Sequence, residues 1–402
     1  MQNTFSNALS KAVSQHIELS PTRHQTLAWL AWLIMQHGTI CLWRLAAYVA
    51  TQAQTDSVRR RLYRFFQHVR LDGAMTARVV VDLLGLEGKP WVLAMDRTNW
   101  DFGKTTINIL MISVIWNGMG IPLIWTLLPT AGNSDTATRT CLLDRLCEVF
   151  PGLKIAALMG DREFIGDAWM AYLQRRKIPF ILRLRENQHV VRDGYDTWTI
   201  AAIARHLTRG QKMFLKGWCR LGQNAGSDAP AVRLAVMRLP TGELLALACS
   251  GNPRRALAAY SHRWTIETLF ANLKTKGFNM EGTHITDPDK LSTLLAVLAL
   301  AVALAVKTGV TAARLKSIPI KKHGRKACSL FALGIHSLRK IFAAASPDQV
   351  FVFLDQLLSQ KLCNRGKTRG IGMIIRFPRP RESDSLRACR RPTILTAFRT
   401  PN

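Results

Sequence analysis

Short apolar runs alternate with helical patterns between residues 91 and 184, and this alternation restricts the fold more than any other feature of the chain. Five apolar runs of strand length lie at 91–95, 107–115, 121–128, 154–159 and 179–184. The turn Asn117-Gly118-Met119-Gly120 predicts a hairpin between the second and third runs. Helices are expected at 136–149 and 165–176. This order predicts an α/β fold, a mixed five-stranded sheet covered by helices.

Outside this core the spacing of apolar residues is different. Residues 1–88 carry apolar side chains at helical spacing, for example Leu27, Leu30 and Leu33, and predict a helical domain. Short apolar runs separated by Gly-rich turns predict a β-rich insertion within the core. The expected units are a helical N-terminal domain (1–88), a core in two parts (89–185 and 253–310), the insertion (186–252) and a C-terminal region (311–402).

The run Leu291–Val306 imitates a membrane span but is sixteen residues long, shorter than the roughly twenty that a bilayer requires. We therefore expect this helix to be buried inside a domain, and we expect no association of the protein with a membrane. The first residues, Met1 to Ser6, lack the pattern of a secretory signal. The eight cysteines form no C-x-x-C pair, which favours buried or incidental thiols in a reducing compartment over a zinc site.

The chain carries a formal net charge of +29, which predicts a polyanionic partner, most commonly nucleic acid. Residues 311–402 contain 19 Lys and Arg against 4 Asp and Glu, a net charge of +15. The clusters Lys321-Lys322…Arg325-Lys326 and Arg365-Gly-Lys367-Thr-Arg369 stand out within it. Residues after about 376 are expected to form a mobile basic tail. A membrane-surface protein would need a basic amphipathic helix, which the sequence lacks.

One N-terminal segment combines arginines with aromatic residues at helical spacing. Thr55-Asp56-Ser57 forms a good N-cap cluster, and the helix that follows contains Arg59, Arg60, Arg61 and Arg64. Such a helix is suited to binding DNA phosphates, so residues 1–88 are interpreted as a DNA-binding domain. The alternative is a solvated basic face on a packed helix.

Two aspartates follow predicted strands, Asp96 after the first and Asp161 after the fourth. If these strands are neighbours, the two carboxylates meet at one crevice of the sheet. A helix across this crevice would add Glu267. Three converging carboxylates repel each other unless cations neutralise them, and hard oxygen ligands suit Mg²⁺ or Mn²⁺. Taken singly, each residue could instead be a turn, cap or solvated helix position.

The segment from Tyr260 to Lys274 adds cations to this pattern. At roughly 100° per residue, a helix beginning at Tyr260 places Arg263, Glu267 and Lys274 within an arc of about 60°. Arg263 and Lys274 on this face would bind phosphates, and Tyr260 would bind a phosphate or position the helix. A surface stripe of ion pairs is the alternative.

These motifs resemble the DDE transposases of the insertion-sequence-four group. That family carries Tyr, Arg, Glu and Lys with two, three and six residues between them, as Tyr260, Arg263, Glu267 and Lys274 stand here. Asp96 lies in Ala-Met-Asp-Arg-Thr-Asn-Trp, Asp161 lies in Met-Gly-Asp-Arg-Glu-Phe, and 132–135 (Gly-Asn-Ser-Asp) is also similar. The resemblance covers about residues 57–310.

The resemblance implies a ribonuclease-H-like core in which Asp96, Asp161 and Glu267 are the catalytic triad and hold two Mg²⁺ ions, with Mn²⁺ as a substitute. It implies excision of an insertion sequence at its terminal inverted repeats and transfer of the 3′ ends into target DNA. It also implies a homodimer on double-stranded DNA, in the bacterial cytosol at the nucleoid. The rival hypotheses are a structure-selective nuclease without strand transfer and a non-catalytic DNA-binding protein derived from a transposase.

Tryptophans and two further arginines complete the predicted DNA contacts. Relatives in this group cleave the second strand through a DNA hairpin with a flipped base stacked on tryptophan, and Trp264 matches the tryptophan of the signature. The stretch 242–247 lacks the second family tryptophan. Trp218 is a substitute for it or, alternatively, a core residue. Arg183 and Arg185, at the end of the fifth strand, are expected to contact DNA.

Overall fold

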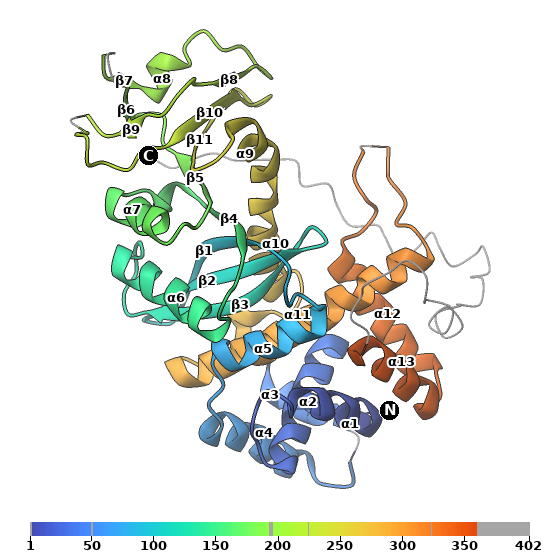
Figure 1. Ribbon diagram of the computed structural model, residues 1–402. Coiled ribbons are helices and arrows are strands. Elements are labelled where there is room, and N and C mark those ends of the chain that lie inside the picture. The colour runs from blue at the N-terminus through green and yellow to red at the C-terminus, as the bar shows by residue number, and fades with distance from the viewer. Residues whose placement is uncertain (1, 50, 193–195, 224, 323, 360–402) are drawn as a thin grey trace.

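In a computed structural model, residues 2–49, 51–192, 196–223, 225–322 and 324–359 are described. Their central feature is an eight-stranded mixed sheet in the order β3-β2-β1-β4-β5-β11-β10-β8 (Figure 1). The strands are β1 Trp91–Phe102, β2 Thr105–Trp116, β3 Met119–Leu128, β4 Ile155–Gly160, β5 Phe180–Leu184, β8 Lys212–Phe214, β10 Arg233–Arg238 and β11 Leu244–Cys249. The mixed α/β class is confirmed, but five strands was too few, since strands of the insertion continue the same sheet.

The first strands of the sheet follow from their sequences. β2 is apolar along most of its length and is buried on both faces between β1 and β3. Asn117 (φ 50°) and Gly118 (φ 75°) form the tight turn between β2 and β3, in the left-handed region that this kind of hairpin requires. β1 and β4 are parallel neighbours, and β4 pairs in parallel with β5. The predicted adjacency of the first and fourth strands is therefore correct.

Helices α6 (Thr136–Val149) and α7 (Asp167–Arg175) pack together, close to their predicted bounds. Asp135 begins α6 as its N-cap and accepts a hydrogen bond from the N–H of Thr138 at 2.7 Å. The rest of the insertion forms a small second sheet and one short helix. Its elements are β6 His189–Val191, β7 Trp198–Thr199, α8 Ile200–Ile203 and β9 Arg220–Leu221.

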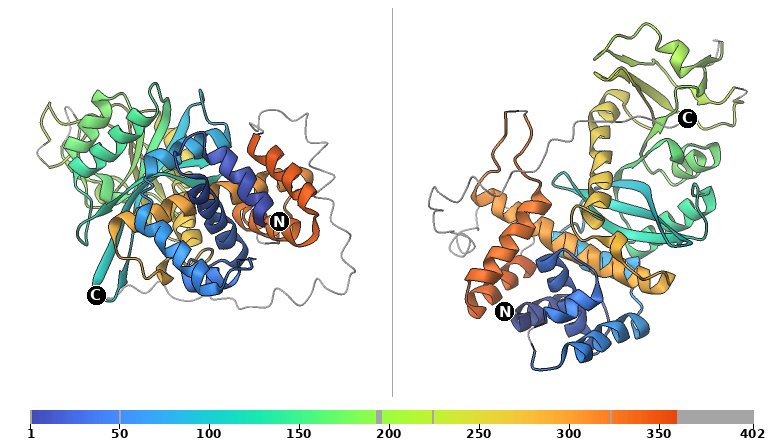
Figure 2. Two further views of the ribbon diagram at one scale, coloured as in Figure 1. Left: turned by 90° about the horizontal axis from the view of Figure 1, so that it is seen from below. Right: turned by 180° about the vertical axis from the view of Figure 1, so that it is seen from behind.

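The N-terminal region is helical, as predicted. Its helices are α1 Gln2–Val13, α2 Pro21–His37, α3 Leu42–Ala47, α4 Thr55–His68 and α5 Gly73–Leu84. The predicted cap of α4 was wrong, because the helix begins at Thr55 and Gln54 occupies the N-cap position. Figures 1 and 2 show these helices below the sheet, against α11 (Pro288–Leu315) and the C-terminal helices α12 (Leu330–Ala344) and α13 (Pro347–Ser359).

The apolar helix α11 is the central element of this helical part. It has 28 residues, so the helix is longer than the sixteen-residue run that the sequence suggested. Its predicted burial inside the protein is confirmed. Among the described residues it is the one helix long and apolar enough to cross a bilayer, and its most apolar window is wholly buried in the protein. α12 crosses α11 so closely that a Cβ atom added to Gly334 would overlap the carbonyl oxygen of Ala305. The crossing therefore requires glycine at this position.

Two short helices and three 3₁₀ turns complete the described fold around the site. They are α9 Pro253–Ala259, the 3₁₀ turns η1 Arg162–Phe164, η2 Tyr260–Arg263 and η3 Met280–Gly282, and the helix α10 Trp264–Leu273. α10 packs against β1 and β3. The predicted basic tail, the cluster at 365–369, Cys363 and Cys389 lie outside the described residues.

Candidate active site

Asp96 lies inside β1 rather than after it, which corrects the predicted end of that strand. β1 pairs with β4 only as far as Ala94 and Met159, so Asp96 emerges just beyond the end of β4. One oxygen of Asp96 accepts the N–H of Arg97 at 2.8 Å. Burial raises the pKa of its carboxyl to about 6, and the charges of Asp161 and Glu267 add to this, against the opposing effects of the Arg97 N–H and the Arg263 guanidinium.

Asp161 follows β4 directly, as predicted, and precedes η1. Its Oδ1 atom is buried and accepts no hydrogen bond from the described residues. The backbone just before it is fixed by Tyr260, whose buried hydroxyl donates to the carbonyl of Gly160 at 3.2 Å. Tyr260 therefore positions the signature segment against β4, the second of its two predicted roles.

The signature segment is not one helix, which corrects the prediction. The 3₁₀ turn η2 carries Tyr260 and Arg263, α10 begins at Trp264, and Lys274 lies past its end in a non-helical conformation. The Lys274 ammonium donates to the carbonyl of Asn99 at 2.9 Å and pairs with Glu281 at 3.0 Å. It thus contacts β1 three residues beyond Asp96, roughly 10 Å along the strand.

Arg263 joins the carboxylates of the site. Its side chain is 2% exposed, with Nη1 3.3 Å from Asp96 Oδ2 and Nη2 donating to Glu267 Oε1. Asp161 is close enough for its charge to act on the same guanidinium. The structure thus gathers the three predicted carboxylates around one buried cation. Arg263 binds Asp96 and Glu267 here and does not present the free phosphate-binding surface that the sequence suggested.

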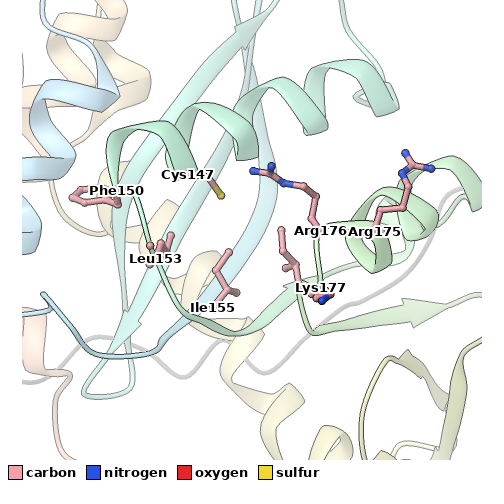
Figure 3. Close-up of a pocket in the computed structure, with 9 residues that line it drawn as sticks. Cys147, Phe150, Leu153, Ile155, Arg175, Arg176 and Lys177 are labelled. Carbon is pink, nitrogen blue, oxygen red and sulfur yellow. The ribbon is translucent and has the colours of Figure 1, made fainter.

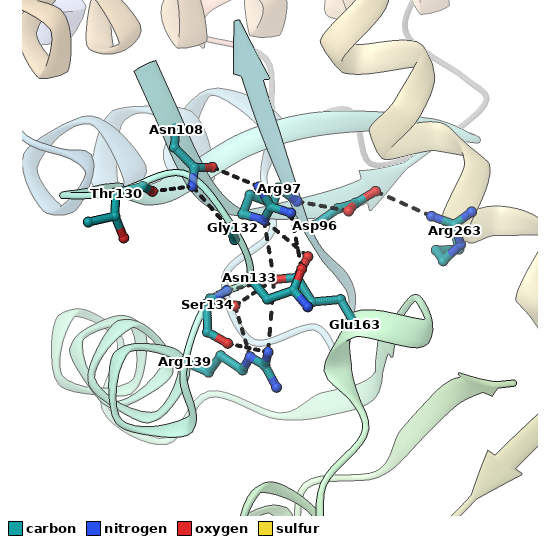
Figure 4. A network of polar contacts seen from close by, with 10 residues as sticks. All are labelled: Asp96, Arg97, Asn108, Thr130, Gly132, Asn133, Ser134, Arg139, Glu163 and Arg263. Atoms are coloured by element: carbon teal, nitrogen blue, oxygen red, sulfur yellow. Dashed lines mark hydrogen bonds and ion pairs between the residues drawn. The ribbon is translucent and has the colours of Figure 1, made fainter. Parts of the chain in front are cut away.

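A second polar network, which was not predicted from the sequence, lies beside Asp96 (Figure 4). Glu163 accepts hydrogen bonds from the Ser134 N–H and hydroxyl, both at 2.9 Å, and from Arg97 Nε at 3.0 Å. Arg139, which is nearly buried, lies 3.9 Å from the same carboxylate. Arg97 also donates to Asn108 at 3.1 Å. The sequence could have indicated this network, since Arg97 directly follows Asp96 and Glu163 lies two residues after Asp161.

The three carboxylates suit a hard divalent cation in kind. Oxygen donors of this type are preferred by Mg²⁺ and Mn²⁺, and the buried Oδ1 of Asp161 has a free lone pair for such a ligand. Across the described part of the chain, no three His, Cys, Asp or Glu side chains already stand as a metal-binding group. Arg263 binds Asp96 Oδ2 and Glu267 Oε1, so its guanidinium competes with a metal ion for these two oxygens.

The predicted DNA-binding arginines of α4 fall into two pairs. Arg61 faces inward, donating to Gln25 at 2.9 Å and to Thr26 at 3.1 Å. Arg59 lies over Trp43 and 3.4 Å from Asp56. Arg60 and Arg64 extend from the exposed face of the helix, one turn apart. The outward pair is the part of α4 that remains available to a partner.

The remaining predicted contacts differ in exposure. Arg183 is paired with Glu243 and largely covered, whereas Arg185 is exposed. Trp264 is 55% exposed. Trp218 is 49% exposed beneath Arg233, whose guanidinium lies 4.6 Å from the ring centre, so the core role expected for it was wrong. Both rings have a free surface for stacking.

A pocket of about 470 Å³ lies at the other edge of the sheet, where β4 begins (Figure 3). Cys147 and Phe150 line one side of it, and Arg175, Arg176 and Lys177 line the other. Arg176 pairs with Asp144 at 3.2 Å. These cations follow the carboxyl end of α7, where positive charge is favourable, and none of the three candidate carboxylates lines the pocket.

Carboxylates such as these are also the ligands that enzymes of metal-dependent phosphoryl transfer use. Residues 87–304, more than half of the chain, match the family described as "Transposase DDE domain", and the chain belongs to this family. The matched segment contains Asp96, Asp161 and Glu267. The predicted resemblance is confirmed at this level.

Among curated proteins, none matches the sequence significantly. Among solved structures, the chain is similar to the piggyBac transposase in its synaptic complex with hairpin DNA, determined by cryo-electron microscopy. That similarity has 12% identity and a TM-score of 0.42, and it covers 95% of this chain and 84% of the other.

Proposed function

We propose that the protein is a cut-and-paste DNA transposase of the insertion-sequence-four type. It excises an element by hydrolysing phosphodiester bonds at the terminal inverted repeats and transfers the 3′ ends into target DNA. The observation that carries the proposal is the meeting of Asp96, Asp161 and Glu267 around the Arg263 guanidinium, inside the segment that matches the family.

In this proposal Asp96, Asp161 and Glu267 are the catalytic residues and hold divalent metal, preferably two Mg²⁺ ions with Mn²⁺ as a substitute. When bound, such ions activate the attacking oxygen and stabilise the leaving oxygen. Arg263 neutralises the carboxylates beforehand, and its withdrawal gives the site a bidentate donor for the scissile phosphate. Tyr260 keeps the backbone before Asp161 in place meanwhile.

The DNA contacts follow from exposure. The exposed Arg60 and Arg64 on α4 bind phosphates of the terminal repeat, and the exposed Arg185 binds a phosphate nearer the site. Lys274 is mostly covered and binds a phosphate once its ammonium leaves Glu281. Trp264 offers its exposed ring to an unstacked base. The complex on double-stranded DNA is a homodimer that bridges two element ends, in the bacterial cytosol at the nucleoid.

One observation favours a second candidate, a DNA-binding protein that does not cut. Arg263 occupies the space between Asp96 and Glu267, and a guanidinium fixed there would exclude metal from Glu267. In this candidate the same carboxylates serve only to hold the signature segment against the sheet.

The test is cleavage of a linear duplex that carries the sequence flanking this coding region, with Mg²⁺, by wild type, Glu267→Gln and the surface control Asp289→Asn. We expect wild type and the control to release the element with free 3′-hydroxyl ends and then join them to a supplied target duplex. Glu267→Gln should bind the same duplex without cutting it. Cutting without joining would indicate a nuclease, and binding without cutting by all three proteins would support the second candidate.

A further inference from the structure

A β-hairpin between α11 and α12 forms a charged arm outside the proposed catalytic site. Ile320 and Lys326 face each other as an antiparallel bridge. Lys321 N–H donates to the Arg325 carbonyl at 2.9 Å, and Ala327 N–H donates to the Pro319 carbonyl at 2.8 Å. These bonds give the arm a defined backbone. The described residues 316–322 and 324–327 are called the basic arm below.

The basic arm carries five cations and no acidic residue: Lys316, Lys321, Lys322, Arg325 and Lys326. All five are exposed. Like charges gathered on so short a segment repel each other, and a polyanion relieves that repulsion. Ile320 is 73% exposed among them, the most exposed large hydrophobic side chain of the described residues.

The direction of the basic arm relates it to the carboxylate site. In Figures 1 and 2 the arm rises from the helical body on the same side as the insertion, and α10 stands between them. α10 carries Glu267. A duplex held at the carboxylates and extending past α10 therefore passes toward the arm rather than away from it.

We propose that the basic arm is a sequence-independent contact to the phosphate backbone of duplex DNA held at the carboxylate site. The proposal rests on the proposed function for the identity of the polyanion. Lys321, Lys322 and Lys326 neutralise phosphates, and Ile320 packs on the sugar edge between them. The arm stabilises the complex without reading sequence, since ammonium groups on phosphates carry no base information.

The test measures binding of a fluorescent duplex with the element end, and of a scrambled duplex, from 50 to 300 mM KCl (about the range in which phosphate contacts dominate). EDTA is present, so that no cleavage occurs. The proteins are full-length wild type, the triple variant Lys321→Ala/Lys322→Ala/Lys326→Ala, and the single variant Ile320→Ala. The matched control removes three exposed cations at the opposite edge of the sheet, Lys154→Ala/Arg175→Ala/Lys177→Ala. Thermal melting verifies that each variant is folded.

Each phosphate contact contributes about 0.9 to the slope of log Kd against log[salt]. The arm variant should therefore lose about 2 to 3 from the slope on both duplexes, whereas the control should keep the wild-type slope. Ile320→Ala should weaken binding several-fold with the slope unchanged, since it removes contact but no charge. An unchanged slope in the arm variant, or an equal loss in the control, would overturn the proposal. Wild type that binds but never cuts would contradict the proposed function alone, because the slopes do not depend on cleavage.

Discussion

Asp161 and Glu163 lie two residues apart after the same strand, yet their surroundings are opposite. Glu163 accepts hydrogen bonds from three donor groups and lies beside two arginines, so the chain itself satisfies its charge. Asp161 has a buried oxygen that accepts none from the described residues. Two neighbouring carboxylates can therefore have different roles. Glu163 orders the loop, and Asp161 has an oxygen that is open to a ligand.

The largest expected effect is on catalysis. Asp161→Asn keeps the size of the side chain but removes the charge that a metal requires. We expect cleavage of the element end to fall by at least about a thousandfold, roughly 4 kcal/mol in the barrier, while the melting temperature stays close to that of wild type. Single-turnover cleavage with Mg²⁺ measures this. Loss of folding instead of activity would show that Asp161 is structural like Glu163.

The reverse pattern is expected for Glu163→Gln. Removing this charge leaves Arg97 and Arg139 close together and largely buried without their counter-charge. Breaking a buried pair of this kind costs about 3 kcal/mol of unfolding free energy. Denaturant unfolding measures it, with the exposed Asp289→Asn as a control that should change by less than about 1 kcal/mol. An unchanged stability would contradict the assignment of Glu163 as the internally satisfied carboxylate.

Arg263→Gln tests whether the guanidinium competes with metal. Without it, Asp96 and Glu267 face each other with only metal to neutralise them. We expect Mn²⁺ to bind the DNA-free variant about tenfold more tightly than wild type, equivalent to about 1.4 kcal/mol. Calorimetric titration is the measurement. Weaker binding by the variant would mean that Arg263 organises the carboxylates for metal and does not exclude it.

Lys307 extends the comparison to a buried cation far from the site. It is 1% exposed in α11 and donates to the carbonyl of Leu83, and burial lowers the pKa of its ammonium to about 8. Since the folded pKa lies below the unfolded value, the unfolded chain binds more protons between about pH 8 and 10.5, and stability rises with pH there. Relative to Lys307→Met, wild type should gain at most about 1.4 kcal/mol per pH unit across this window. Denaturant unfolding of both proteins at pH 7 and pH 10 measures this. An equal difference in unfolding free energy between the two proteins at both pH values would contradict it.

Much of the sheet around the candidate site was predictable from local patterns. The hairpin at Asn117-Gly118, the helix at 136–149 and the position of Asp161 after β4 depend on residues close in sequence, and each agrees with the structure. Glu267 was expected on a helix packed across the crevice, and its shared contact with Arg263 places it close to Asp96.

What the sequence did not predict depends on tertiary contacts. β1 continues through Asp96 to Phe102 because β2 pairs with it along that length, which the polar residues of the strand conceal. The signature segment changes from 3₁₀ to α geometry at Trp264, and helical periodicity cannot show such a change. Arg263 and Glu163 bind residues that are distant in the sequence. Arg263 binds Asp96, and Glu163 accepts hydrogen bonds from Arg97 and Ser134.

The proposal that Asp161 is a metal ligand can be tested by Mn²⁺ binding to the protein on an uncut element-end duplex, compared between wild type and Asp161→Asn. Calorimetric or paramagnetic titration of both proteins gives the number of ions and their affinity. The assignment of Asp161 as a ligand predicts that wild type binds and that the variant loses at least one ion. Equal binding by the two proteins would contradict it, and the orphaned oxygen of Asp161 would then have no part in holding metal.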